Sequence, residues 1–265
     1  MIFDTHCHLN DETLYKDLDN VISRALNSGV EKMIVIGWDK ASSELAIKLA
    51  EQYDFIYVVI GFHPENIFDI NDNILYETLN LYKHPKVVGI GEIGLDYHWS
   101  KEPEKRELQK EYFIKQIDFA NKVGLPISIH SREAFQDTLA ILKEHKPQYG
   151  GVMHCYSGSV ENIQDIINLN LYIGLDGPVT FTNAKTPKEV AAEVPLEKLV
   201  VETDSPYLSP HPLRGTVNEP ANISLIVDAI ADIRDMSKKH LLDVLYQTPA
   251  SYLIYEIIFK RNTCC

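Results

Sequence analysis

Eight short apolar runs alternate with helical patterns along the chain, and this alternation is the strongest constraint on its fold. Several runs are almost continuously apolar, such as 33–36 and 57–60, which is typical of parallel strands buried on both faces. The predicted strands cover residues 2–8, 32–37, 56–63, 87–93, 126–131, 151–156, 171–176 and 199–204.

The segments between these runs carry apolar residues three and four positions apart, as amphipathic helices do. One example is Val21, Ile22, Ala25 and Leu26, a face that stops at Gly29. Because no linker or change in composition interrupts the eight β–α units, we expect one α/β domain over residues 1–265, a single (β/α)8 TIM barrel. Residues 261–265 are expected to form a flexible tail, and an open doubly wound sheet is the alternative fold.

The chain has 265 residues and a formal net charge of −13, so its overall field does not attract phosphate backbones. If it handles nucleic acid, local arginines or bound metal ions must supply positive charge. None of its four cysteines forms a Cys-x-x-Cys pair, and no secretory leader or membrane-length apolar run is visible. We therefore expect a cytoplasmic protein, with the nucleus as the alternative, and no membrane partner.

Two histidines, His6 and His8, lie one residue apart on the first predicted strand. Residues two apart on a strand point to the same side, so both imidazoles should converge on one point. Four later predicted strands also carry a histidine or a carboxylate near their ends; these residues are Glu92, His130, His154 and Asp204. Since the carboxyl ends of the strands meet at one face of a barrel, we expect the six side chains to gather there.

Mixed imidazole and carboxylate ligands from several strands are typical of catalytic metal sites that bind one or two divalent ions, here Mg, Mn or Zn. Each histidine taken alone also fits an ordinary hydrogen-bonded core position. Glu202 shares a strand face with Asp204 and is the alternative carboxylate ligand; Asp204 is favoured because it lies nearer the strand end. Cys7 and Cys155 should point away from the neighbouring histidines, which disfavours a thiol nucleophile.

Glycines surround Glu92 in the segment Gly89-Ile90-Gly91-Glu92-Ile93-Gly94. The spacing matches the dinucleotide-binding pattern G-x-G-x-x-G, but the glycines lie within a strand and a loop follows, so we reject that interpretation. Because glycine has no side chain, we expect these residues to let another group approach Glu92 closely.

These residues resemble the TatD-like metal-dependent deoxyribonucleases, a branch of the amidohydrolase superfamily. The motifs that carry the resemblance are Asp4-Thr5-His6-Cys7-His8-Leu9, Gly61-Phe62-His63-Pro64, Gly91-Glu92-Ile93-Gly94-Leu95-Asp96-Tyr97, Ile129-His130-Ser131-Arg132, His154-Cys155-Tyr156-Ser157-Gly158, Glu202-Thr203-Asp204-Ser205-Pro206 and Arg214-Gly215 with Asn218-Glu219-Pro220. The resemblance implies that His6, His8, Glu92, His130, His154 and Asp204 bind the metal, with Glu92 between two ions.

The resemblance also places His63 and Arg132 near the substrate phosphate, and Arg214 joins them as a further substrate contact. Asp204, Glu92 and His63 are the expected catalytic residues. Tyr156 is a candidate for stacking on a base, as is Tyr207, and core packing is the alternative for both. Thr182 and Thr216-Val217 stand where the family often carries a basic residue, which implies weaker binding of nucleic acid.

The expected function is hydrolysis of phosphodiester bonds of DNA, acting on single-stranded ends as a 3′–5′ exonuclease, with a metal-activated water as the nucleophile. The alternative keeps the same site and cleaves an ester or an amide, for instance an aminoacyl ester on tRNA. A cleft that presents His63, Arg132 and Arg214 together would favour the phosphodiester, because an amide needs no such set. A third hypothesis, a binding scaffold without catalysis, is disfavoured because no candidate ligand is missing.

Overall fold

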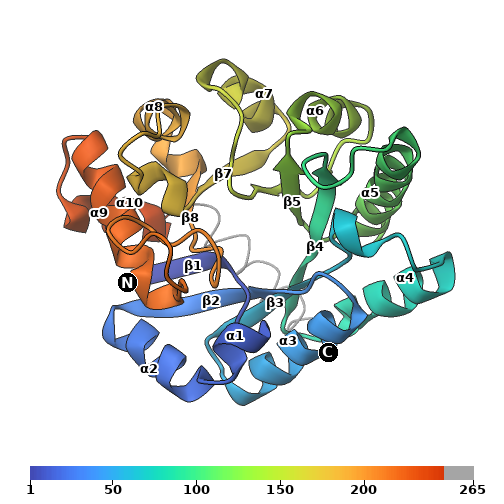
Figure 1. Cartoon of the computed structure of the whole chain (residues 1–265), viewed down its shortest axis with the longest axis horizontal. Coiled ribbons are helices and arrows are strands. Elements are labelled where there is room, and N and C mark those ends of the chain that lie inside the picture. Colours follow the sequence, from blue (N-terminus) through green and yellow to red (C-terminus); the bar gives the residue numbers. More distant parts are fainter. Residues whose placement is uncertain (248–265) are drawn as a thin grey trace.

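The computed structural model describes residues 1–247, which form a ring of eight parallel strands surrounded by helices (Figure 1). The strands are β1 (Ile2–Cys7), β2 (Val30–Ile36), β3 (Ile56–Ile60), β4 (Val87–Asp96), β5 (Ile127–Arg132), β6 (Gly151–Met153), β7 (Leu171–Leu175) and β8 (Leu199–Val201). They are ordered β1 to β8 in the sheet, each paired in parallel with the next. The predicted (β/α)8 barrel is thus confirmed, and the open-sheet alternative is excluded.

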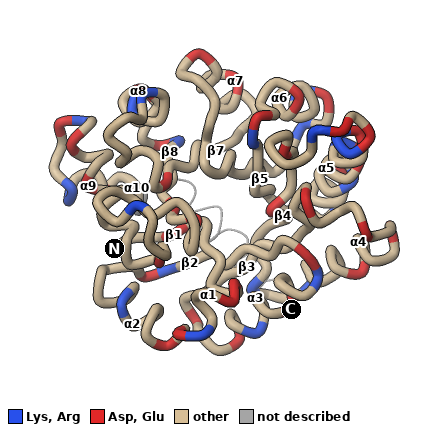
Figure 2. The backbone as a smooth tube through the Cα atoms, in the orientation of Figure 1, with Lys and Arg blue, Asp and Glu red and all other residues tan. Residues whose placement is uncertain are grey.

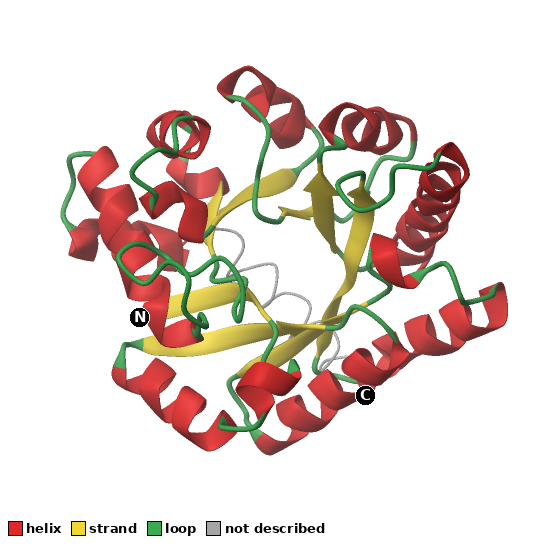
Figure 3. Ribbon diagram, in the orientation of Figure 1, coloured by secondary structure: helices red, strands yellow, loops and turns green. Residues whose placement is uncertain are grey.

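Helices lie outside the strands around the whole ring (Figure 3). They are α1 (Glu12–Tyr15), α2 (Leu18–Asn27), α3 (Lys40–Gln52), α4 (Asp72–Leu79), α5 (Pro103–Val123), α6 (Phe135–Glu144), α7 (Ile163–Asn168), α8 (Thr186–Glu193), α9 (Ile223–Ile233) and α10 (Lys238–Gln247). Lys and Arg are interspersed with Asp and Glu over these outer helices (Figure 2). No helix within residues 1–247 is long and apolar enough to cross a bilayer.

The helices form where the sequence offers an apolar stripe and suitable end groups. In α9 the buried residues Ile223, Ile226, Val227 and Ile230 follow the three- and four-residue spacing of one helix face. Asp39 caps α3 by accepting from the Ser42 N–H, and the Ser42 side chain bonds back to the Asp39 N–H. These stripes pack on the outer faces of the strands, which explains why the strands are apolar on both sides.

The strand predictions located every strand but placed several ends wrongly. Strand β4 runs on to Asp96, whereas β3, β6 and β8 stop at Ile60, Met153 and Val201. As a result His63, His154 and Asp204 lie on the loops just beyond their strands. The expected tail at 261–265, which includes Cys264 and Cys265, lies outside the described residues.

The barrel closes between β1 and β8 without a regular ladder within the described chain. Instead the buried Asp4 carboxylate accepts from the Thr203 N–H at 3.0 Å and from its hydroxyl at 2.6 Å. Backbone bonds from the Asp204 N–H to the His6 carbonyl (2.9 Å) and from the His8 N–H to the Ser205 carbonyl (2.8 Å) continue the closure. Closure of the barrel therefore places the predicted ligands His6 and His8 directly beside Asp204.

The glycines of β4 admit the neighbouring strand. A Cβ on Gly94, whose φ is +146°, would collide with the His130 carbonyl, and one on Gly91 would lie 2.6 Å from the Ser128 carbonyl. These glycines therefore allow a close approach of the β5 backbone on either side of Glu92. In the β4–β5 pairing the register shifts between Ile90 and Ile93, and the Glu92 N–H donates to the Gly37 carbonyl at 3.1 Å.

Replacing Gly94 with alanine is expected to lower the free energy of unfolding by about 3 kcal/mol, because the added carbon is both overpacked and in a strained backbone region. Gly29→Ala is the matched control. Gly29 also has a positive φ, +86°, but nothing lies within 4 Å of the added carbon. This control should cost only about 1 kcal/mol. Equal losses for both variants in urea unfolding would contradict the close approach of β5.

Candidate metal centre

Side chains from five strand ends converge at the carboxyl-terminal face of the barrel. The His6 and His8 Nε2 atoms lie 3.3 Å apart. Asp204 Oδ1 lies 3.7, 3.4 and 3.6 Å from the Nε2 atoms of His6, His8 and His154, respectively. Donors about 2.1 Å from one tetrahedral ion would be about 3.4 Å apart, so these separations suit a shared divalent cation.

Glu92 lies between this group and a second one. Its Oε2 is 3.5 Å from His6 Nε2 and 3.9 Å from His8 Nε2, while its Oε1 is 3.8 Å from His154 Nε2. The same Oε1 accepts a 2.8 Å hydrogen bond from His130 Nδ1. Two sets that could hold a metal therefore share Glu92: one with His6 and His8, the other with His63 and His130.

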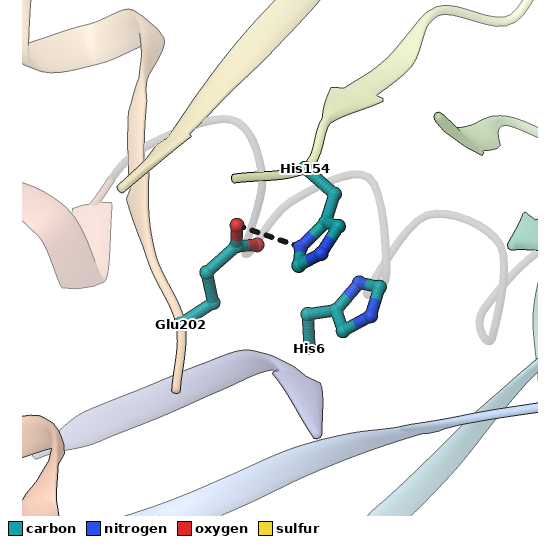
Figure 4. Close-up of side chains that lie close together, drawn as sticks. All are labelled: His6, His154 and Glu202. Atoms are coloured by element: carbon teal, nitrogen blue, oxygen red, sulfur yellow. Dashed lines mark hydrogen bonds and ion pairs between the residues drawn. The ribbon is translucent and has the colours of Figure 1, made fainter. Parts of the chain in front are cut away.

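The structure thus brings together all six residues predicted as ligands: His6, His8, Glu92, His130, His154 and Asp204. Sequence reasoning had left Glu202 open as an alternative to Asp204. Glu202 is fully buried and is already hydrogen-bonded, since its Oε1 accepts from His154 Nδ1 at 2.9 Å and from the Cys155 N–H at 2.6 Å. Figure 4 shows the hydrogen bond between His154 and Glu202. The His6 ring stacks on the His154 ring, with 3.5 Å between the two ring centroids.

Asp96 is a member of the site that sequence reasoning missed. Its Oδ2 accepts from His130 Nε2 at 3.1 Å. Asp96 and Glu202 therefore each orient a histidine through one ring nitrogen, as carboxylates commonly do behind metal-binding imidazoles. Strand alternation could have identified it. Asp96 lies four positions after Glu92, an even number, and residues so spaced on an extended strand share a face.

The charge balance of the buried face also fits a cation. Six buried carboxylates lie in the barrel: Asp4, Glu92, Asp96, Asp176, Glu202 and Asp204. No lysine or arginine within the described chain is buried to offset them, so imidazolium groups, bound cations or protonation of the carboxyl must do so. Asp176 Oδ2 has no hydrogen-bond partner, and burial, with the charges of Glu202 and Asp204, raises the pKa of this carboxyl far above its usual range.

The electrostatics of the ligands follow from this crowding. Burial raises the pKa of Glu92, but hydrogen bonds and charge from His130 and His6 outweigh it and hold that pKa well below its usual range. Burial lowers the pKa of His130, yet its bonds to Asp96 and Glu92 raise it to about 9. Burial also lowers the pKa of His154, but the nearby charges of Glu202 and Asp204 outweigh this effect. The pKa of His154 is therefore raised well above its usual value.

A cleft of about 1060 Å³ opens onto this centre. His63, Arg132 and Arg214 line it together with Glu92, His130 and Asp204. Tyr207 also lines it, whereas Tyr156 does not, which corrects its prediction as a substrate contact. Tyr156 is 4% exposed, packs on Phe135 and donates its hydroxyl to the Ser159 carbonyl at 3.0 Å. The core-packing alternative therefore describes it.

The two cysteines next to ligands differ in position. Cys7 is fully buried and its thiol donates to the Ile34 carbonyl at 3.4 Å, away from the centre as expected. Cys155 lines the cleft, contrary to expectation, because it follows β6 with a φ of +42° and strand alternation no longer applies. Burial raises the pKa of both thiols well above the usual value, so neither is a ready nucleophile.

A (β/α)8 barrel with a buried histidine and carboxylate set at its carboxyl-terminal face defines the class of metal-dependent barrel hydrolases. The chain matches the family described as TatD related DNase over residues 3–253. It is 45% identical over 245 residues to YabD of Bacillus subtilis, named an uncharacterized metal-dependent hydrolase, covering 92% of this chain and 95% of that one. Escherichia coli YcfH, named likewise, is 35% identical over 247 residues, 92% of each chain.

Solved structures agree with this assignment. YJJV, a TatD homolog from Escherichia coli, superposes with a TM-score of 0.87 at 28% identity, covering 96% of this chain and 97% of that one. A TatD family hydrolase from Entamoeba histolytica gives 0.82 at 25% identity, with coverage of 92% and 95%. The chain belongs to the TatD family and is a metal-dependent hydrolase, which confirms the resemblance found in the sequence.

Replacing Glu202 with glutamine is expected to weaken metal affinity by about 10- to 100-fold, because His154 loses the charged partner that fixes its ring. Metal titration of the apoprotein measures this loss. Asp69→Asn, an exposed carboxylate outside the cleft, is the control and should leave the affinity unchanged. Unchanged affinity in the Glu202 variant would mean that the contact with His154 has no role in holding the ion.

Metal binding should release protons at neutral pH. Because the pKa of His130 is about 9 and that of His154 is also raised, both imidazoles carry an extra proton in the metal-free protein near pH 7. A ligand nitrogen must lose that proton, so affinity should rise by about tenfold per pH unit for each proton released, up to about pH 9. Calorimetry in buffers of different ionisation enthalpy measures the release; a flat affinity between about pH 6.5 and about pH 8.5 would contradict it.

Proposed function

We propose that this hydrolase cleaves phosphodiester bonds of DNA, as a 3′–5′ exonuclease. One observation carries the proposal: His63, Arg132 and Arg214 line the same cleft as the candidate metal ligands. Guanidinium groups match phosphate oxygens in charge and geometry. A small neutral amide or ester would not call for two of them beside the centre.

The donor set fits one or two divalent ions, magnesium, manganese or zinc, held by His6, His8, Glu92, His130, His154 and Asp204. Such ions, when bound, supply Lewis acidity and lower the pKa of water toward neutrality. Burial raises the pKa of Asp204, but the charge of His154 and the hydrogen bond from His8 outweigh it and keep the pKa low. Asp204 is therefore a carboxylate at neutral pH and can accept the proton of an attacking water.

His63 acts by orienting the phosphate. Its Nδ1 accepts from the Glu65 N–H at 3.2 Å, so the ring proton lies on Nε2 and can be donated into the cleft. Burial, reinforced by the charge of His130, lowers the pKa of His63 to about 3. A neutral imidazole is a poor acid toward a leaving oxygen, so of its two expected roles the positioning one is supported. Arg132 and Arg214 offset charge on the phosphoryl oxygens.

The purified chain is expected to hydrolyse a single-stranded oligonucleotide when magnesium or manganese is added. Asp204→Asn should lower kcat by about 10²- to 10⁴-fold, the usual contribution of a general base, and Asp69→Asn should not. The same preparations are assayed on a panel of esters and amides, including an aminoacyl-tRNA. Faster turnover of an ester or amide than of DNA would replace the proposed substrate, and full activity of the Asp204 variant would refute its role.

A further inference from the structure

Large apolar side chains remain exposed at the mouth of the cleft. Trp99 is 64% exposed and Tyr207 is 54% exposed, and both line the cleft. Exposed aromatic rings beside a polar site are typical of surfaces that bind a ligand. Trp99 was not singled out from the sequence, because a loop tryptophan there gives no periodic signal.

Two arginines at the same mouth pair with aromatic rings. The Arg132 guanidinium carbon lies 5.7 Å from the centre of the Trp99 ring, and that of Arg214 lies 4.1 Å from the centre of the Phe181 ring. Within residues 1–247 no carboxylate lies within ion-pair distance of either guanidinium. Both charges are therefore available to a phosphate while the rings hold them in place.

The side chain of Asp96 connects the backbone of Trp99 to the candidate metal centre. Asp96 Oδ1 accepts from the backbone N–H groups of His98 (2.9 Å) and Trp99 (3.1 Å), while its Oδ2 accepts from His130. The loop that carries Trp99 is also held by Gln109 of α5. The Gln109 amide donates to the Ser100 hydroxyl at 3.1 Å and to the Asp96 carbonyl at 3.2 Å. The backbone that carries the Trp99 ring is thereby held relative to the candidate ligands before any substrate binds.

We propose that Trp99 is a stacking platform for an unpaired base, and that it makes the site specific for single-stranded nucleic acid. The inference rests on the proposed function and goes beyond it by naming the residue that selects the substrate. A base inside a duplex has both faces covered by its neighbours, so away from duplex ends only an unpaired base can place a face on the ring. The phosphate next to that base would meet Arg132 and the centre beyond it.

The net charge of the molecule favours a binding contact that does not depend on long-range attraction. The cleft is lined by two arginines and no lysine, against the acidic residues Glu65, Glu92, Asp96 and Asp204, and the net charge of the chain is −13. Each phosphate contact to a single strand contributes a slope of only about −0.7 to the salt dependence of binding. Stacking of a base on an aromatic ring tolerates any base and does not require a charged partner, so it can supply affinity where long-range attraction does not.

The test compares Trp99→Ala and Trp99→Phe in the metal-loaded full chain on two oligonucleotides, one with all its bases and one lacking bases at its 3′-terminal positions. We expect Trp99→Ala to raise KM about tenfold on the first substrate only, since loss of one stacked base is typically of that size, and Trp99→Phe to retain most of the affinity. Tyr149→Ala, an exposed ring that does not line the cleft, is the control.

A second measurement separates this inference from the nuclease proposal. The chain has two tryptophans, so Trp38→Phe leaves Trp99 as the sole indole fluorophore. A short single-stranded oligonucleotide should quench it in metal-free protein, and a circular duplex, which has no ends, or a baseless strand should not. Equal KM changes on both substrates, or no quenching, would overturn the platform even if DNA is cleaved. Quenching without cleavage would keep the platform and refute the nuclease.

Discussion

The structure depends on the mutual compensation of charges at one buried end of the barrel. Carboxylates and imidazoles crowd together there without any buried lysine or arginine among the described residues. Each carboxylate that stays charged there must therefore find an imidazole, a hydroxyl, a backbone N–H or a cation. The contacts of Asp96 with His130, of Glu202 with His154 and of Asp4 with Thr203 all follow from this requirement. They also hold the candidate ligands in place before any ion binds.

Much of this arrangement could be predicted from the sequence. Continuous apolar runs separated by helical periodicity predicted the eight strands, and the position of residues near strand ends predicted which side chains would meet. That prediction works because barrel topology maps every strand end to the same face. His6 and His8, which satisfy it most simply, lie within 3.3 Å of each other.

The parts that could not be predicted depend on where a strand ends and on what a loop does afterwards. Cys155 enters the cleft because β6 stops two residues earlier, so alternation gives the wrong direction. Tyr156 also follows the end of β6, and its ring packs on Phe135 in the core instead of lining the cleft. Trp99 follows a local turn in which Asp96 accepts from the backbone N–H groups two and three residues later, but the direction of its side chain toward the mouth has no sequence signal. Such loop contacts are decided by tertiary packing and leave no periodic pattern.

The closure between β1 and β8 has a consequence for how the molecule comes apart. Elsewhere neighbouring strands share a ladder, but here a few bonds around Asp4, His6 and Thr203 join the two edges of the sheet. His6 and His8 belong to one edge and Asp204 to the other. An ion held by all three would join the two edges of the sheet at the junction that lacks a ladder. Its binding energy then adds to the resistance of the whole fold against melting.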